Sequence, residues 1–316
     1  MYREYLERLG RTLALDPTTG APPPLALAPR TGALQVAIEA PDINTLDFLA
    51  LHGCALQVNI ARKNSSLGRL ARPSQALLLE LEFLRLAPAC IEELEREGRN
   101  ELAAELATAQ ALKRDQLPAR IFNATLGADE YRAFWRTSRP PGEFPSVPNA
   151  VTLKALHAID SATARWLAGD YAVDGFEFEL LLSEVAGGSG GELLLELNRL
   201  THWLGAADRL LQARSKRGPL CGPNLRREAA DILPNVVEKY FVAQIQPGAA
   251  ALNRSYHELL PPIRNLEERL ASTAPAAFSQ WRGERDSVLS EGTEASRRHV
   301  AQIQSLLEPC RAAPGL

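Results

Sequence analysis

The stretch CALQVNIARKNSSLGRLARPSQALLLELEFLRLAPAC, residues 54–90, begins and ends in cysteine and holds a proline at its centre. After that proline, apolar residues recur at intervals of three and four, as Leu77, Leu81 and Leu84 show. This spacing predicts an amphipathic helix. We expect residues 44–63 and 73–87 to form an antiparallel helical hairpin that turns through NSSLGRLARP.

The same spacing runs along most of the chain and predicts an all-α fold. The predicted helices cover residues 2–14, 44–63, 73–87, 90–114, 128–136, 149–168, 190–216, 224–243, 248–271 and 284–308. The one strand candidate, LQVAIE at 34–39, is short enough to be an extended lead-in to a helix.

Two proline-rich stretches read as connections between helices, and there is no fixed repeat or sustained heptad. We therefore expect a multi-helix globule of two packed lobes. The expected parts are an N-terminal helix with a proline-rich extended segment (1–40), an N-terminal lobe (41–136), a linker (137–148) and a C-terminal lobe (149–316).

Composition places the chain among folded proteins of ordinary type. Of its 316 residues, 46% are hydrophobic and 23% are charged. A net charge of -3 gives no reason to expect nucleic acid or an anionic membrane surface as a partner. The first ten residues, MYREYLERLG, are amphipathic and charged, which is not typical of a signal peptide. We expect either a cytosolic protein or an exported one whose signal is absent from this sequence.

The four cysteines suggest two pairs. If the hairpin turns near residues 70–71, Cys54 lies opposite Ala87 and less than one helical turn from Cys90. We expect the helix to end near Pro88, so that Cys90 can approach Cys54 for a disulfide. Two buried free thiols are the alternative.

Cys221 and Cys310 are the remaining pair, and each stands where the backbone is expected to adjust. A simple up-and-down path through the last three predicted helices would place them at opposite ends, which is an objection to pairing them. No C-x-x-C motif or His/Cys cluster offers a zinc site. Disulfides are therefore the better hypothesis, and they imply an oxidising compartment.

Three polar or glycine-rich segments are candidates for a ligand-binding site. AGGSGGELLLEL (186–197) lacks the Lys-Ser/Thr of a nucleotide loop, and we interpret it as a flexible connection. ARKNSSLGR (61–69) and the polar positions within 240–256 either satisfy helix ends or form a ligand site, and we favour the structural interpretation. If they do form a site, the two segments lie near each other. The candidate ligand-binding residues are Arg62, Asn64, Ser65, Gln246, Asn253 and Arg254.

Five segments carry a resemblance to a known family. They are RKNSSLGRLARPSQALLLELEFL (62–84), QLPARIFNATLGADEYRAFW (116–135), GGSGGELL (187–194), PLC (219–221) and YFVAQIQPGAAALNR (240–254). With them the chain resembles an uncharacterised family of proteobacterial lipoproteins, catalogued as a domain of unknown function. The most specific piece is R-x-N-S-x-L-G followed by a long leucine-rich helix.

The resemblance implies export and anchoring in the bacterial envelope. Members typically begin with a signal peptide and a lipid-attachment cysteine, which we expect only in the full-length protein. The resemblance strengthens the disulfide hypothesis, with Cys54 paired to Cys90 and Cys221 to Cys310. It carries over no catalytic residue.

Two classes of function remain open. One is a non-catalytic envelope protein that binds a partner protein or small ligand; the other is an envelope enzyme with an acid/base pair in a cleft between the lobes. G-x-S-x-G occurs once, as GGSGG (187–191) within the glycine-rich segment interpreted above as a connection, and no H-E-x-x-H motif occurs, which favours the binding protein. We expect no cofactor, no metal and no nucleic-acid partner, and contact with the membrane only through the N-terminal lipid anchor.

Overall fold

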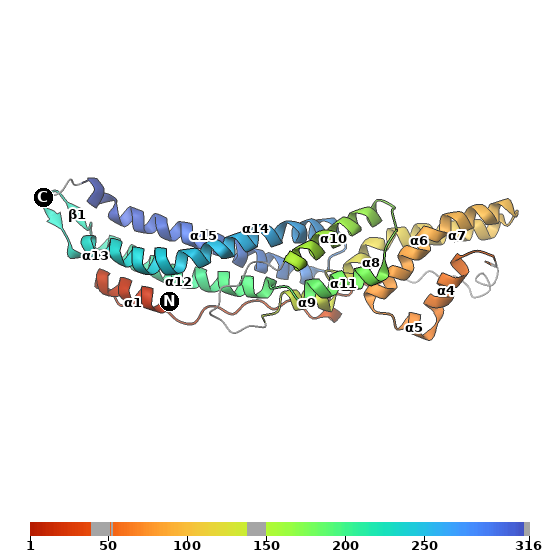
Figure 1. Cartoon of the computed structure of the whole chain (residues 1–316), viewed down its shortest axis with the longest axis horizontal. Helices are drawn as coiled ribbons and strands as arrows, with labels where there is room; N and C mark the ends of the chain where they lie inside the picture. The colour runs from red at the N-terminus through yellow and green to blue at the C-terminus, as the bar shows by residue number, and fades with distance from the viewer. Residues whose placement is uncertain (39–50, 52, 138–149, 313–316) are drawn as a thin grey trace.

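A computed structural model describes residues 1–38, 51, 53–137 and 150–312. Among these, the only strands are the two-residue β1 (Cys221–Gly222) and β2 (Leu225–Arg226), so the all-α prediction is confirmed. The molecule is elongated, with α1 (Tyr2–Leu13) towards one end and α5 (Ser66–Arg69) towards the other (Figure 1).

Most of the other described residues lie in helices. In chain order they are α2 (Thr31–Leu34), α4 (Leu56–Asn64), α6 (Pro73–Arg96), α7 (Asn100–Asp115), α8 (Leu117–Ala124), α9 (Asp129–Phe134), α10 (Ala150–Leu167), α11 (Gly175–Ala186), α12 (Gly190–Lys216), α13 (Glu228–Val236), the π-helical η1 (Val237–Ile245), α14 (Gln246–Arg269) and α15 (Ala276–Ala312). The short helices α2, α5, α8 and α11 were not predicted from the sequence.

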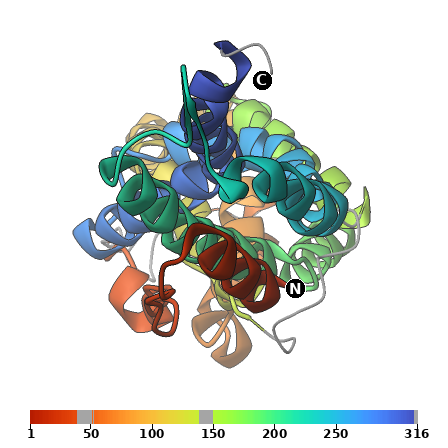
Figure 2. The ribbon, with the colours of Figure 1, turned by 90° about the vertical axis from the view of Figure 1, so that its left-hand side faces the viewer.

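The main core lies between the long helices α12, α14 and α15, with α1 packed beside them (Figure 2). Leu197, Leu200 and Leu204 on α12 are buried, and their spacing of three and four places them on one face of the helix. Gly292 on α15 faces Leu197, where a Cβ would lie 2.5 Å from the leucine Cβ. The missing side chain therefore lets α12 and α15 approach closely.

One continuous helical rod replaces two of the predicted helices. Residues 228–269 run through α13, η1 and α14 without turning back (Figure 1). Pro247 stands in the first turn of α14, where a missing N–H costs little, and it follows directly on the wider turns of η1. The expected reversal near Pro247 is wrong.

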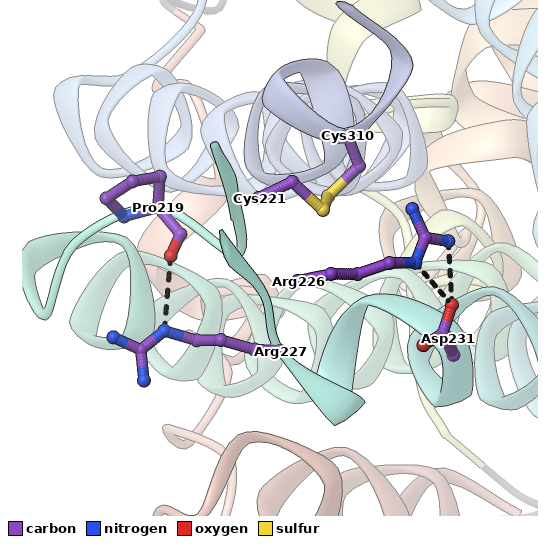
Figure 3. The surroundings of a disulfide bond; sticks show 6 residues. All are labelled: Pro219, Cys221, Arg226, Arg227, Asp231 and Cys310. Atoms are coloured by element: carbon purple, nitrogen blue, oxygen red, sulfur yellow. Dashed lines mark hydrogen bonds and ion pairs between the residues drawn. A yellow bond between two sulfur atoms is a disulfide. The ribbon is translucent and has the colours of Figure 1, made fainter. Parts of the chain in front are cut away.

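This continuity brings Cys221 and Cys310 together. The rod runs away from the β1–β2 hairpin and α15 returns alongside it, so both cysteines lie at the same end. They form a disulfide with a Cα–Cα distance of 4.9 Å (Figure 3). The guanidinium of Arg226 donates to Asp231 at 2.7 and 2.9 Å beside this bridge. The sequence objection to this pair is removed.

The leucine-rich helix also differs from its prediction. α6 continues through Pro88 to Arg96, and it buries Leu84, Ala87 and Cys90 on its inner face. We attribute the tolerance of Pro88 to this burial, which offsets one lost backbone hydrogen bond. The expected end of the helix at Pro88 is wrong.

The predicted helix 90–114 is instead divided at Gly98, whose φ of 76° is readily adopted by glycine. Cys90 pairs with Cys54, as expected, but from within the helix; their Cα atoms are 5.7 Å apart. Leu34 is the last residue of α2, the structure places no strand at residues 35–38, and Glu39 lies outside the described residues.

The glycine-rich loop is closely packed rather than a flexible connection. A Cβ on Gly190 would collide with the ring of Phe134, and one on Gly191 would lie 2.5 Å from the carbonyl oxygen of Arg136. A Cβ on Gly188 would lie 2.6 Å from Thr152. These glycines therefore let the start of α12 pack against the end of α9.

A second, smaller core lies between α4, α6 and α7. It contains Phe83, Ala87 and Leu94 of α6, whereas Leu77 and Leu81 of the same helix belong to the main core. α6 thus connects both cores. The predicted linker at 137–148 lies outside the described residues except for Thr137, so the lobe boundary stays a prediction.

Candidate functional site

The turn between α4 and α6 forms a braced protrusion, residues 62–72, which we call the hairpin tip. Ser65 caps α5: its Oγ accepts a hydrogen bond from the Gly68 N–H at 3.1 Å and donates to the Arg62 carbonyl at 2.7 Å. A Cβ on Gly68 would collide with the carbonyl oxygens of Arg62 and Lys63. The R-x-N-S-x-L-G segment thus forms a turn that is stabilised by the Ser65 hydrogen bonds and by the close approach at Gly68.

The hairpin tip is tied to α6 through its first two cations. Arg62 lies 3.3 Å from Glu82, which also accepts a hydrogen bond from Asn59 at 2.9 Å. Lys63 lies 2.5 Å from Glu80. Together with the Cys54–Cys90 disulfide, these contacts hold the tip in one position relative to the second core.

Glu80 is the buried centre of the contacts that hold the hairpin tip. Its side chain is 1% exposed and is shared by three cations: Lys63, Lys113 at 2.6 Å and Arg120 at 3.6 Å. Burial alone would raise the pKa of Glu80, but Lys113, Arg120 and Lys63 together lower it. Burial lowers the pKa of Lys113 to about 8, against the opposing attraction of Glu80. The pKa of Glu80 is thus lowered by the three cations that share it, and the pKa of Lys113 is lowered by burial.

Two leucines project from the hairpin tip into solvent. Leu67 and Leu70 each expose 84% of their surface. Arg69 and Arg72 stand beside them and are also exposed. Leu67 and Leu70 are not among the residues predicted from the sequence, although apolar residues interleaved with arginines in a glycine-containing turn are a signal for such a pair.

The sequence-predicted candidates fall into two groups that the structure does not bring together. Asn64 is exposed on the tip with Arg62 and Ser65, and its carbonyl accepts from the Arg69 Nε at 3.0 Å. The other group lies on α14, which packs against α10, α12 and α15 and is separated from α4 and α5 along the long axis (Figure 1). The expected proximity of the two segments is therefore not found.

On α14, Gln246 and Arg254 are exposed. Asn253 is half-buried and donates through Nδ2 to the Thr293 carbonyl at 3.3 Å. This contact joins α14 to α15, whereas the Asn253 Oδ1 is buried with no hydrogen-bond partner among the described residues.

Two other polar networks are buried between helices. His299 is fully buried, with the Tyr5 hydroxyl 2.7 Å from its Nε2 and Asp208 2.5 Å from its Nδ1. Burial, with the charge of Asp208, raises the pKa of Tyr5 far above its ordinary value. Arg285 binds Glu267 through two hydrogen bonds of 2.7 and 3.0 Å. These groups connect α1, α12, α14 and α15.

Three cavities among the described residues differ in the polarity of their linings. One of about 570 Å³ is mainly apolar and lies between the proline-rich segment and α12, where Trp135, Leu194 and Trp203 line it. A polar one of about 350 Å³ includes Glu267 in its lining, and one of about 300 Å³ lies beside Arg72. Neither Tyr5 nor His299 lines any of the three.

Within the described ranges, no group of three or more His, Cys, Asp and Glu side chains is placed to hold a metal ion. In the same residues, no helix combines the length and apolar character needed to cross a membrane.

Comparison with known proteins gives a family but no activity. No curated protein and no solved structure matches the chain. Residues 2–314 match the family described as "Protein of unknown function (DUF3080)". Because the match covers nearly the whole chain, the protein belongs to this family.

Proposed function

We propose that the protein is an exported, non-catalytic component of the bacterial envelope that acts by binding, with the hairpin tip as its docking surface. The exposed leucine pair on a braced turn carries this proposal. Burying both side chains on docking would contribute roughly 2–5 kcal/mol. Because the turn is already held by capping and ion pairs, little ordering entropy opposes that gain.

The compartment is supported by the cysteines. Both cysteine pairs are placed as disulfides, and structural disulfides form and persist in oxidising environments such as the periplasm. The resemblance to lipoproteins points the same way. An N-terminal lipid anchor in the full-length protein would then attach the molecule to a membrane and leave the tip free to dock.

The alternative of an enzyme would need a general acid and base that open onto a cavity. The buried Tyr5–His299–Asp208 network serves as a contact between helices, which is a structural role.

Site-specific photocrosslinking in intact host cells tests the proposal. A photoreactive amino acid replaces Leu67 in the full-length protein, and a matched variant carries it at Leu27, which is 89% exposed on the proline-rich segment. We expect a discrete adduct, with protein or lipid, at position 67 and none at position 27. Equal labelling at both positions, or no adduct at position 67, would refute docking through the tip.

A further inference from the structure

We infer that the hairpin tip docks onto an anionic phospholipid surface, with Leu67 and Leu70 entering the headgroup region and the surrounding cations contacting lipid phosphates. This inference rests on the proposed function, and it names the component that the tip binds. It assigns a second membrane contact in addition to the expected N-terminal anchor.

The local charge supports an anionic surface although the chain as a whole carries -3. No acidic residue occurs from Leu51 to Leu79. The hairpin tip and the charged residues that anchor it combine six cations with two carboxylates. Their local net charge is +4. The cations are Arg62, Lys63, Arg69, Arg72, Lys113 and Arg120, and the carboxylates are Glu80 and Glu82.

The nearest further carboxylates do not reverse this sign. Asp129 and Glu130 line the cavity that Arg72 also lines, and Glu179 accepts a hydrogen bond from Ser74 at 2.7 Å. Counting all three still leaves a local charge of +1. Because charges beyond about 8 Å are screened at physiological salt, the tip presents its local charge to a surface rather than the net charge of the protein.

The shape and composition of the tip favour lipid over a protein partner. A stable protein interface needs about 20–30 residues on each side, far more than the tip provides. The hot spots of such interfaces are enriched in Trp, Tyr and Arg and poor in Leu, and residues 62–72 supply arginines and two leucines but no aromatic side chain. Two aliphatic side chains beside Arg and Lys match the pattern of membrane-surface segments.

The arrangement of the cations is suited to a headgroup layer. Arg69 and Arg72 have long apolar stems that can lie along the acyl boundary while the guanidinium groups stay with the phosphates. Guanidinium groups also bind phosphate through two parallel hydrogen bonds. The brace from Cys54–Cys90 and Gly68 fixes the leucines in the exposed position before any lipid is met.

Co-sedimentation with vesicles tests this inference. The purified, oxidised protein is mixed with phosphatidylcholine vesicles that either contain or lack phosphatidylglycerol. We expect binding only with phosphatidylglycerol, and we expect added salt to weaken it. Replacing Arg69 and Arg72 by Gln should lower the apparent affinity about 25-fold, or about fivefold for each charge.

Replacing Leu67 and Leu70 by Ser should lower the affinity at least tenfold each, and Leu27→Ser serves as the matched exposed control. Circular dichroism and melting temperature establish that each variant is folded. Equal binding to both vesicle types, no binding, or binding unchanged in the tip variants would overturn the inference. If vesicles fail to bind while position 67 crosslinks to a protein in cells, the lipid inference fails and the docking proposal stands; failure of both experiments removes both.

Discussion

Glu80→Gln should be among the most destabilising single substitutions in the second core. The substitution keeps the shape of the side chain and removes the one carboxylate shared by Lys63, Lys113 and Arg120. Lys113 is 1% exposed, so its ammonium would remain buried without a counter-charge. Breaking a buried ion pair from one side costs about 3–5 kcal/mol, which sets the expected loss of unfolding free energy.

Lys113→Met is the matched control. Two cations remain on Glu80, and the methionine can pack on the ring of Phe83, over which the ammonium now lies at 4.6 Å. We expect this change to cost less than about 1 kcal/mol, because a desolvated charge is exchanged for an apolar group of similar length.

The stability of Lys113→Met should also depend on pH differently from that of the wild type. The unfolded chain keeps the Lys113 proton up to its ordinary pKa of 10.5, whereas the folded state releases it above about 8. The unfolded state therefore binds more protons in this window, and the stability of the wild type rises with pH there. The slope contributed by Lys113 approaches about 1.4 kcal/mol per pH unit, and Lys113→Met should lack it.

Urea denaturation followed by far-ultraviolet circular dichroism measures these differences. Tryptophan fluorescence, recorded in parallel, reports the main core, because all four tryptophans lie outside the α4–α6–α7 core. If Glu80→Gln costs under about 1 kcal/mol, or if Lys113→Met costs as much as Glu80→Gln, the shared-carboxylate account is wrong.

Two further predictions concern packing and the second disulfide. Gly190→Ala should lower stability by about 1–3 kcal/mol, because the new methyl group collides with Phe134, whereas Gly187→Ala in the same loop should cost far less, since its Cβ meets nothing nearer than 3.7 Å. Equal melting temperatures of the two variants would contradict close packing of this loop. Replacing Cys221 and Cys310 together by Ala should lower the unfolding free energy by about 4.6 kcal/mol on the chain-entropy model, given their separation of 89 residues. An unchanged urea midpoint under non-reducing conditions would show that this bridge does not form in solution.

The helical fold could be predicted because it depends on a local pattern. Apolar spacing of three and four placed the long helices α1, α12 and α15 in the sequence, although α15 begins earlier than expected. Proline was misleading at two places. Pro88 marked the expected end of one helix and Pro247 the expected start of a separate one, yet burial of the inner face at α6 and the wide turns of η1 keep the helical path continuous at both.

Only part of the candidate site could be predicted from the sequence. The polar turn could be located, because Asn, Ser and Gly in one short segment are typical of a helix break. Its partners could not, because Glu80 meets Lys113 and Arg120 only when α6, α7 and α8 pack together. Close packing of Gly190 against Phe134 is equally a tertiary property, which is why the loop was interpreted as flexible.

Insertion of position 67 into a bilayer is the most direct test of the account. Leu67→Cys, with the native cysteines kept as disulfides, carries an environment-sensitive fluorophore, and Leu27→Cys carries the same label as a control. With vesicles containing phosphatidylglycerol, we predict a blue shift and quenching by brominated acyl chains at position 67 only. A label at position 67 that stays in a water-like environment, or that responds no more than the label at position 27, would contradict the docking of the hairpin tip onto lipid.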